Sequence, residues 1–174
     1  MQKPSSQEYN PFFKTYIDKC SDEPVIDLLK KQQVTIQKFM QVLKGDDLKI
    51  KYEKDKWSVA EVLGHIADTE RVMSTRALHI SRGDQNKLPG FDHDSFVINA
   101  GHANWNKEEL AAEIGIVRAG TISLLSKMTD KQEKIIGNAN GSPVSPRALA
   151  CIIFGHMEHH VSILKERYLI DAKI

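Results

Sequence analysis

The chain has 174 residues, of which 41% are hydrophobic and 27% are charged, a composition typical of one globular domain with a sizeable core. Its formal net charge of +1 leaves no basic stripe for nucleic acid and no acidic tail. Aromatic residues make up 7% of the chain and are scattered, so a base-stacking platform is not expected either.

The N-terminal part is expected to form an arm followed by a long helix. Residues 1–20 carry too many apolar side chains for a free tail, so we expect them to pack on the bundle. A first long helix is predicted over residues 24–44, with Ser21 or Asp22 as its cap and Gly45 at its end. Its apolar residues recur at helical spacing: Val25, Ile26, Leu29, Ile36, Phe39, Met40 and Leu43.

A second helix is predicted from Ser58 to Ser81. Ser58 and Glu61 have the spacing of a capping box, and Gly83 follows the end of the helix. The inward-facing line of this helix holds residues within about 60° of His65 on a helical wheel: Val62, Thr69, Val72 and Arg76. A histidine on a core-facing line needs a partner, because an unpaired buried polar group costs on the order of 1–3 kcal/mol.

The segment between the second and third helices is a long crossover, residues 85–104, in which a short helix is expected after Asp94. Structured crossovers of this length in compact domains are often functional. A third helix is predicted from Asn106, capped against Glu109, to about Lys127. The segment 135–145 that follows is rich in Gly, Asn and Pro, with a tight turn at Asn140-Gly141, and no strand series is expected.

The last helix is predicted over Pro146–Tyr168, with Ser145 as its cap. His156 and His160 are one turn apart, about 6 Å along the axis, and both lie in its apolar stripe. Glu158 lies on the opposite side of the helix, where water is expected. The rest of the stripe falls within about 80° of His156: Leu149, Ile152, Ile153, Ile163 and Leu164.

Four long amphipathic helices with one long crossover predict an all-α, four-helix bundle and a single domain over residues 1–174. Facing helices of such bundles build metal sites, and neutral imidazole is a good ligand for zinc, nickel, copper and iron. His65, His156 and His160 are therefore the candidate metal ligands. Three protein ligands would leave positions open for water and substrate.

The other histidines are weaker candidates. On a helical wheel, His159 falls about 80° from the line of the candidate ligands, so it is expected at the edge of the site or in contact with the ligands rather than among them. His79 is about 21 Å along its helix from His65, too far to share a metal ion with it. His93 and His102 lie in the crossover, where exposed loop histidines are usual, although one of them would be available as a fourth ligand. Hydrogen-bonded core histidines without a metal remain an alternative for the whole set.

Five further residues near this face have two interpretations each. Arg76 is expected to form an internal ion pair, with binding of a substrate carboxylate as the alternative. Asp68 and Glu70 are expected to be solvated or paired with neighbouring helices. Asp92, after a Pro-Gly turn, is a candidate acid/base or histidine partner. Trp57 is expected to anchor the helix start rather than to form a substrate platform.

Two features bear on the compartment. The cysteines, Cys20 and Cys151, are too few for a disulfide framework and suit a reducing environment, with Cys151 as a packed thiol. Residues 1–10 are polar and no apolar run reaches the roughly 18 residues that span a bilayer. We therefore expect no signal peptide, no membrane association and a cytoplasmic location.

Four segments of the chain, in this order, resemble the DinB/YfiT-like family of metalloenzymes, the DinB superfamily. They are KWSVAEVLGHIADTER (Lys56–Arg71), SRGDQNKLPGFD (Ser81–Asp92), NANGSPVSPRAL (Asn138–Leu149) and GHMEHHVSILKERYL (Gly155–Leu169). The early segment YNPFFKTYI (Tyr9–Ile17) also resembles the N-terminal arm of a subgroup of the family. The resemblance covers nearly the whole chain. It is specific for the family and much less so for an activity.

The resemblance implies a four-helix bundle of unusual topology that is often a homodimer. It also implies a divalent metal, zinc or nickel, held by one histidine of the second helix and an H-x-x-x-H pair of the last. Those positions match His65, His156 and His160. Characterised members include thiol-dependent S-transferases and a maleylpyruvate isomerase that uses a low-molecular-weight thiol, whereas others are described as metal-dependent hydrolases.

Three hypotheses follow. The first is an enzyme in which the metal activates water or a low-molecular-weight thiol toward a small-molecule substrate, giving hydrolysis or S-transfer. The second is a non-catalytic metal-binding protein with a role in stress response or partner binding, and the third is a helical protein without metal. A closed coordination sphere would favour the second, and an open metal position beside a pocket would favour the first.

Overall fold

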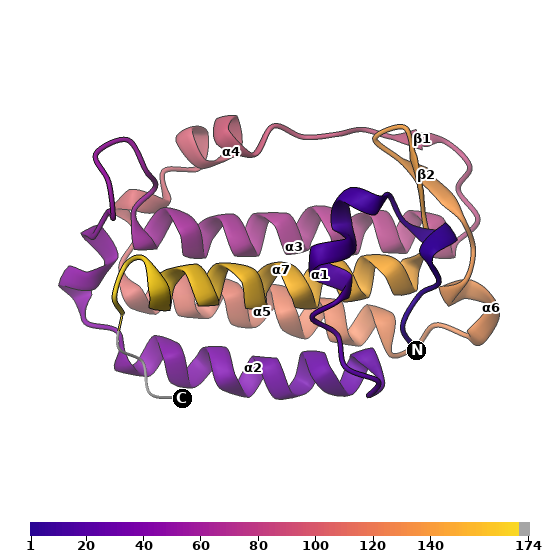
Figure 1. Cartoon of the computed structure of the whole chain (residues 1–174), viewed down its shortest axis with the longest axis horizontal. Coiled ribbons are helices and arrows are strands. Elements are labelled where there is room, and N and C mark those ends of the chain that lie inside the picture. The colour runs from indigo at the N-terminus through magenta and orange to yellow at the C-terminus, as the bar shows by residue number, and fades with distance from the viewer. Residues whose placement is uncertain (171–174) are drawn as a thin grey trace.

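A computed structural model of the chain describes residues 1–170. Its four long helices confirm the predicted four-helix bundle. Because a long crossover separates the second and third of them, these two run in the same direction, as Figure 1 shows. The four are α2 (Val25–Val42), α3 (Val59–Ser81), α5 (Lys107–Leu125) and α7 (Pro146–Glu166).

Helices α3 and α2 do not share a main interface, since each packs instead against both α5 and α7. Buried apolar side chains form two clusters along the bundle. One contains Leu29, Ile80 and Leu149, and the other contains Phe39 and Leu63. Within the described residues, no helix combines the length and apolarity needed to cross a membrane.

The helix starts follow the capping chemistry read from the sequence, with one exception. Ser58 and Asn106 form capping boxes with the third residue of α3 and α5, and the Ser145 hydroxyl accepts a hydrogen bond from Ala148 N–H. The exception is α2, whose N-cap is Pro24, with no side-chain cap. The prediction of Ser21 or Asp22 was therefore wrong, and α2 also ends at Val42, before Gly45.

A small three-stranded sheet corrects the expectation of no strand series. Strand β1 (Lys87–Leu88) of the crossover pairs in parallel with β2 (Gly137–Ala139), which pairs antiparallel with β3 (Ser142–Val144). The predicted tight turn joins β2 to β3, with positive φ angles of 52° at Asn140 and 80° at Gly141. Strands of two or three residues are too short to show alternation in a sequence.

The N-terminal arm lies against α7. It consists of η1 (Ser6–Glu8), η2 (Pro11–Phe13) and α1 (Lys14–Ile17). Glu8 is buried, and its carboxylate accepts hydrogen bonds from the guanidinium of Arg147 and from the Ser145 hydroxyl. The arm is therefore joined to the first turn of α7.

The remaining short elements flank the bundle. They are η3 (Gly45–Lys49), α4 (His93–Ala100), η4 (His102–Asn104) and α6 (Asp130–Glu133). Helix α4 confirms the short helix expected in the crossover. It begins at His93, with Asp92 as its N-cap.

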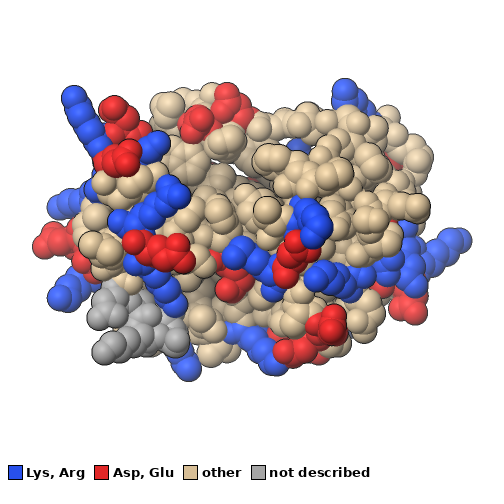
Figure 2. Space-filling view, in the orientation of Figure 1, with Lys and Arg blue, Asp and Glu red and all other residues tan. Residues whose placement is uncertain are grey.

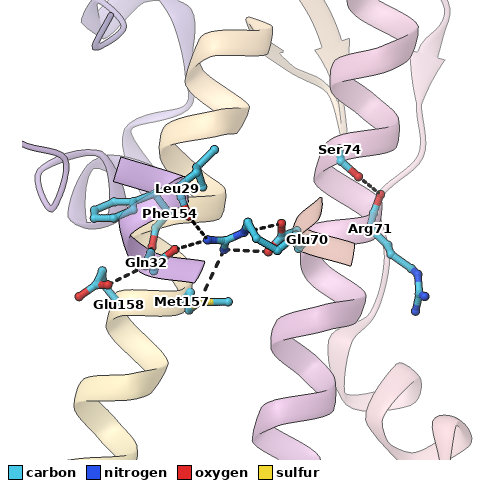
Figure 3. Close-up of polar contacts among 9 residues, drawn as sticks. Leu29, Gln32, Glu70, Arg71, Ser74, Phe154, Met157 and Glu158 are labelled. Atoms are coloured by element: carbon cyan, nitrogen blue, oxygen red, sulfur yellow. Dashed lines mark hydrogen bonds and ion pairs between the residues drawn. The ribbon is translucent and has the colours of Figure 1, made fainter. Parts of the chain in front are cut away.

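A buried ion pair joins all four long helices. The fully buried guanidinium of Arg118 in α5 forms two hydrogen bonds with the carboxylate of Glu70 in α3, at 2.8 and 2.9 Å. It also donates to the Gln32 side-chain oxygen of α2 at 2.8 Å and contacts the sulfur of Met157 in α7 at 3.6 Å. Figure 3 shows these partners, with Gln32 continuing the network to Glu158.

Candidate metal centre

The three histidines singled out by helical periodicity meet in space. His65 of α3 and His156 of α7 place their Nε2 atoms 3.0 Å apart, and His160 Nε2 lies 3.1 Å from His156 Nε2. All three candidate ligand atoms lie within 4.8 Å of one another. The i,i+4 spacing in α7 supplies two of the imidazoles, and the antiparallel contact with α3 supplies the third.

This spacing fits a single metal ion. Ligand nitrogens at about 2.0–2.1 Å from a tetrahedral zinc ion lie roughly 3.3 Å apart, close to the two distances measured here. The donor set is three neutral nitrogens from rigid helices. The donor chemistry and two of the three nitrogen spacings therefore fit a three-histidine site.

Burial favours the neutral form that a metal ligand needs. Desolvation lowers the pKa of His65 to about 4 and that of His160 to about 3, with further lowering from neighbouring histidines. The pKa of His156 is also well below its ordinary value, for the same two reasons. At neutral pH all three imidazoles are uncharged, so no proton competes with a cation for their nitrogens.

Aromatic rings hold the histidines in place. The ring of Trp57, just before α3, packs against the His65 ring at 4.8 Å between centroids, with the two planes tilted by 51°. Tyr16 of the arm meets the His156 ring edge-to-face at 5.6 Å and the His159 ring at 5.5 Å. Trp57 precedes α3, as expected of an anchor at the helix start, and it also lines the cavity beside the cluster.

A cavity of about 530 Å³ opens beside the three histidines. Its walls come from α3 and α7, from the N-terminal arm, from the crossover around Phe91 and from the β2–β3 turn. The arm and the turn are joined by a hydrogen bond from Asn10 to the Ser142 hydroxyl. In Figure 2 the surface is hollowed beneath the crossover, so the cavity is open to solvent.

Two crossover histidines differ from each other. His93 is exposed, as expected, and its ring lies 6.0 Å from that of His65 at the wall of the cavity, outside the three-histidine cluster. His102 was expected to be exposed but is buried, because its ring packs where a side chain at Gly64 would be. Its Nδ1 lies 4.0 Å from an Asp68 oxygen and has no hydrogen-bond partner among the described residues.

The remaining histidines follow the sequence interpretation more closely. His159 is half-buried and lies at the wall of the cavity, next to His160. His79 lies far from the cluster, where its Nδ1 contacts an Asp84 oxygen at 2.7 Å. Only three of the seven histidines therefore converge on one point.

Among the charged candidates, the structure makes three corrections. Arg76 forms no ion pair with a described residue and instead donates to the Pro89 carbonyl at the cavity wall. Asp92 does not reach the site, because its carboxylate accepts from the Asp94 and Ser95 N–H groups at the start of α4. Glu158 points away from the cluster, but it is half-buried and bonded to Gln32 rather than solvated.

Tyr16 is one of the cavity residues that sequence reasoning did not assign to the site, and it contacts a histidine of the cluster. It lies in the arm, about 140 residues before the histidine that it contacts. One signal in the sequence was Gly155, a glycine beside His156 in the middle of a predicted helix. A side chain there would overlap the Tyr16 carbonyl oxygen, so the glycine marks the point where the arm approaches α7.

The fold and the cluster together define a four-helix bundle with a three-histidine centre on two of its helices. The chain belongs to the DinB superfamily, whose model matches residues 28–164. No curated protein sequence matches it significantly.

Two solved structures have the same fold. One is YfiT from Bacillus subtilis, described as a probable metal-dependent hydrolase with an unusual four-helix bundle topology. It is 17% identical, with a TM-score of 0.68 over 95% of this chain and 92% of that one. The other is a mycothiol-dependent maleylpyruvate isomerase, 12% identical, with a TM-score of 0.64 over 80% of this chain and 60% of that one.

Proposed function

We propose that the protein is a metal-dependent enzyme in which His65, His156 and His160 hold one divalent ion, zinc or nickel. The convergence of three neutral imidazoles, two buried and one half-buried, at the wall of a cavity is the observation that carries the proposal. Bound there, the ion would lower the pKa of a coordinated water or thiol and so supply a nucleophile at neutral pH. The substrate would be a small molecule, since the cavity measures about 530 Å³.

Two reactions fit this site, hydrolysis and S-transfer from a low-molecular-weight thiol. No Asp or Glu is among the described residues that line the cavity, so activation of water would lack a carboxylate as general base. A thiol needs less help, because its ordinary pKa of about 8.5 is far below that of water. S-transfer is in keeping with the thiol dependence of the isomerase among the structural neighbours, whereas the imidazole of His159 at the cavity wall is available as a base for either nucleophile.

His159 is the side chain available to take up the proton that the nucleophile releases. It is half-buried at the wall of the cavity, and its ring lies 5.2 Å from that of His160. Burial lowers its pKa, which favours the neutral imidazole, the form that can accept a proton. Tyr16, at 5.5 Å from the same ring, would fix its orientation.

The alternative is a non-catalytic metal-binding protein, which needs a fourth protein ligand to close the coordination sphere. Among the described residues the cluster has three members. His93, the nearest additional histidine, has its ring 6.0 Å from that of His65 and is exposed. An open position beside a cavity therefore supports the enzyme. A homodimer remains a prediction from the family resemblance.

An activity screen tests the proposal. Zinc- and nickel-loaded protein would be assayed for transfer of low-molecular-weight thiols to monochlorobimane and for hydrolysis of p-nitrophenyl acetate. We expect the wild-type protein to turn over substrate in one of the two assays. The rate should fall about 100-fold or more in His160→Ala and should be unchanged in His79→Ala, which replaces a histidine outside the cluster. Turnover that survives both His160→Ala and a chelator would contradict the proposal.

A further inference from the structure

One face of α3 connects the histidine cluster to a buried arginine. His65, Thr69, Met73 and Arg76 all line the same cavity. Their spacing of four, four and three residues places them on one side of the helix, and Arg76 follows His65 by about 16 Å along its axis. The cavity therefore has two ends, with the imidazoles at one and a guanidinium at the other.

The guanidinium of Arg76 is buried without a counter-ion. The residue is 8% exposed, and no ion pair joins it to any described carboxylate. Its contacts are a hydrogen bond of 2.6 Å to the Pro89 carbonyl, a contact of 3.5 Å with the Met73 sulfur, and the Phe91 ring at 5.8 Å. A guanidinium has five N–H donors, so these contacts leave donors free for a ligand.

Arg118, the other buried arginine of the bundle, shows what a structural guanidinium looks like in this protein. Its Nε and Nη2 atoms form two hydrogen bonds to the Glu70 carboxylate, and Nη1 has two oxygen acceptors. Arg76, by contrast, has no carboxylate partner among the described residues, and its one oxygen acceptor there is the Pro89 carbonyl. Burial of an unpaired charge is costly, which gives an anionic ligand a large advantage at this position.

The formal charge on the residues that line the cavity is positive, like that of Arg76. Arg76 is the single residue with a formal charge among the described lining residues, and none of them is acidic. A divalent ion on the neutral histidines would add positive charge at the opposite end. Low-polarity walls strengthen such a field, so the cavity selects anions.

Thr69 supplies a polar group between the two ends. It is buried, it lines the cavity, and its hydroxyl has no hydrogen-bond partner among the described residues. Met73 and Ile152 make the surroundings apolar. A buried hydroxyl of this kind needs a partner from a ligand or from water.

We propose that Arg76 binds the carboxylate of an elongated, anionic substrate or cosubstrate whose reactive group lies at the three histidines, and that Thr69 bonds a polar atom in its middle. The position of the reactive group rests on the proposed function. The carboxylate site at Arg76 does not.

The experiment uses two matched thiols, ω-mercaptooctanoate and ω-mercaptooctanol, titrated calorimetrically into zinc-loaded protein. We expect wild type to bind the carboxylate at least about tenfold more tightly than the alcohol. Arg76→Met should remove this preference without changing the affinity for the alcohol, and Arg76→Lys should keep part of it. Equal affinities in wild type, or a preference that persists in Arg76→Met, would overturn the inference.

A second titration separates the anion site from the metal site. Octanoate, which has no thiol, would be titrated into metal-free wild type and Arg76→Met. Binding that is about tenfold weaker in the variant supports the carboxylate site even if no metal binds. Octanoate binding that is absent in wild type, or equal in the two proteins, overturns it while the metal proposal stands. Folding of Arg76→Met is checked by its melting temperature, which is expected not to fall, because the variant loses one hydrogen bond to the Pro89 carbonyl but also removes an unpaired buried charge.

Discussion

Gly155 in α7 is the residue at which the arm and the histidine cluster come together. It precedes His156, and a methyl group on its α-carbon would overlap the Tyr16 carbonyl oxygen. Because that neighbour is backbone rather than a flexible side chain, the arm or the helix would have to shift. The same shift would move Tyr16, whose ring contacts His156.

We predict that Gly155→Ala lowers the free energy of unfolding by about 1–3 kcal/mol, measured by urea denaturation. Gly120→Ala is the matched control, since Gly120 is also inside a helix but has open space around it. The control should gain roughly 0.5–1 kcal/mol, because alanine favours the helix. Equal effects at the two glycines would contradict the close approach.

At the scale of elements, Glu8 determines how the arm is attached to α7. Burial alone would raise its pKa, yet hydrogen bonds from Arg147, Ser5 and Ser145 lower the pKa from 4.5 to about 2. A carboxyl whose pKa is lowered by folding stabilises the protein above its unfolded-state pKa. That contribution is lost as the pH falls through the folded-state pKa.

We predict that Glu8→Gln costs about 2 kcal/mol of unfolding free energy at neutral pH, because Arg147 loses its carboxylate partner. The difference from wild type should shrink as the pH falls from 4.5 toward 2, where wild-type Glu8 takes up a proton. Denaturation curves over this pH range measure it. Glu23→Gln, which removes an exposed ion pair with Lys31, is the control and should change little. A pH-independent difference would refute this role of Glu8.

The long helices could be predicted from the sequence because each carries its own signals. Periodic apolar residues and the caps Ser58, Asn106 and Ser145 are local features. The sheet could not be predicted, since β1 and β2 pair across about 50 residues and have two and three residues each. The burial of His102 could not be predicted either, because it depends on a contact between residues far apart in the sequence. Its ring occupies the space that the absent side chain of Gly64 leaves free, although the crossover itself is polar.

The site could be predicted only in part, for related physical reasons. His65, His156 and His160 follow from the faces of two helices that must both turn toward the core. The isolation of Arg76 does not follow, because the absence of a counter-ion depends on every segment that surrounds it. The contact of Tyr16 with His156 likewise requires knowledge of where the arm lies.

At the scale of the whole molecule, the pair of Arg118 and Glu70 holds the bundle together from the inside. We predict that Arg118→Met costs about 3–5 kcal/mol of unfolding free energy, because it leaves the Glu70 carboxylate buried and unpaired. The double variant Arg118→Met with Glu70→Leu should recover much of this loss. Denaturation of the two single variants and the double variant measures the coupling, and strictly additive losses would contradict it.

The histidine cluster has its own consequence for the whole molecule, because a metal held by α3 and α7 would join the two helices that build the cavity. Metal content by mass spectrometry on untagged protein tests this account most directly, with His65→Ala and His156→Ala beside wild type and His79→Ala as the control. The account predicts about one transition-metal ion per chain in wild type and the control, and a sharp loss in both cluster variants. No metal after incubation with zinc or nickel, or undiminished metal in the cluster variants, would contradict it.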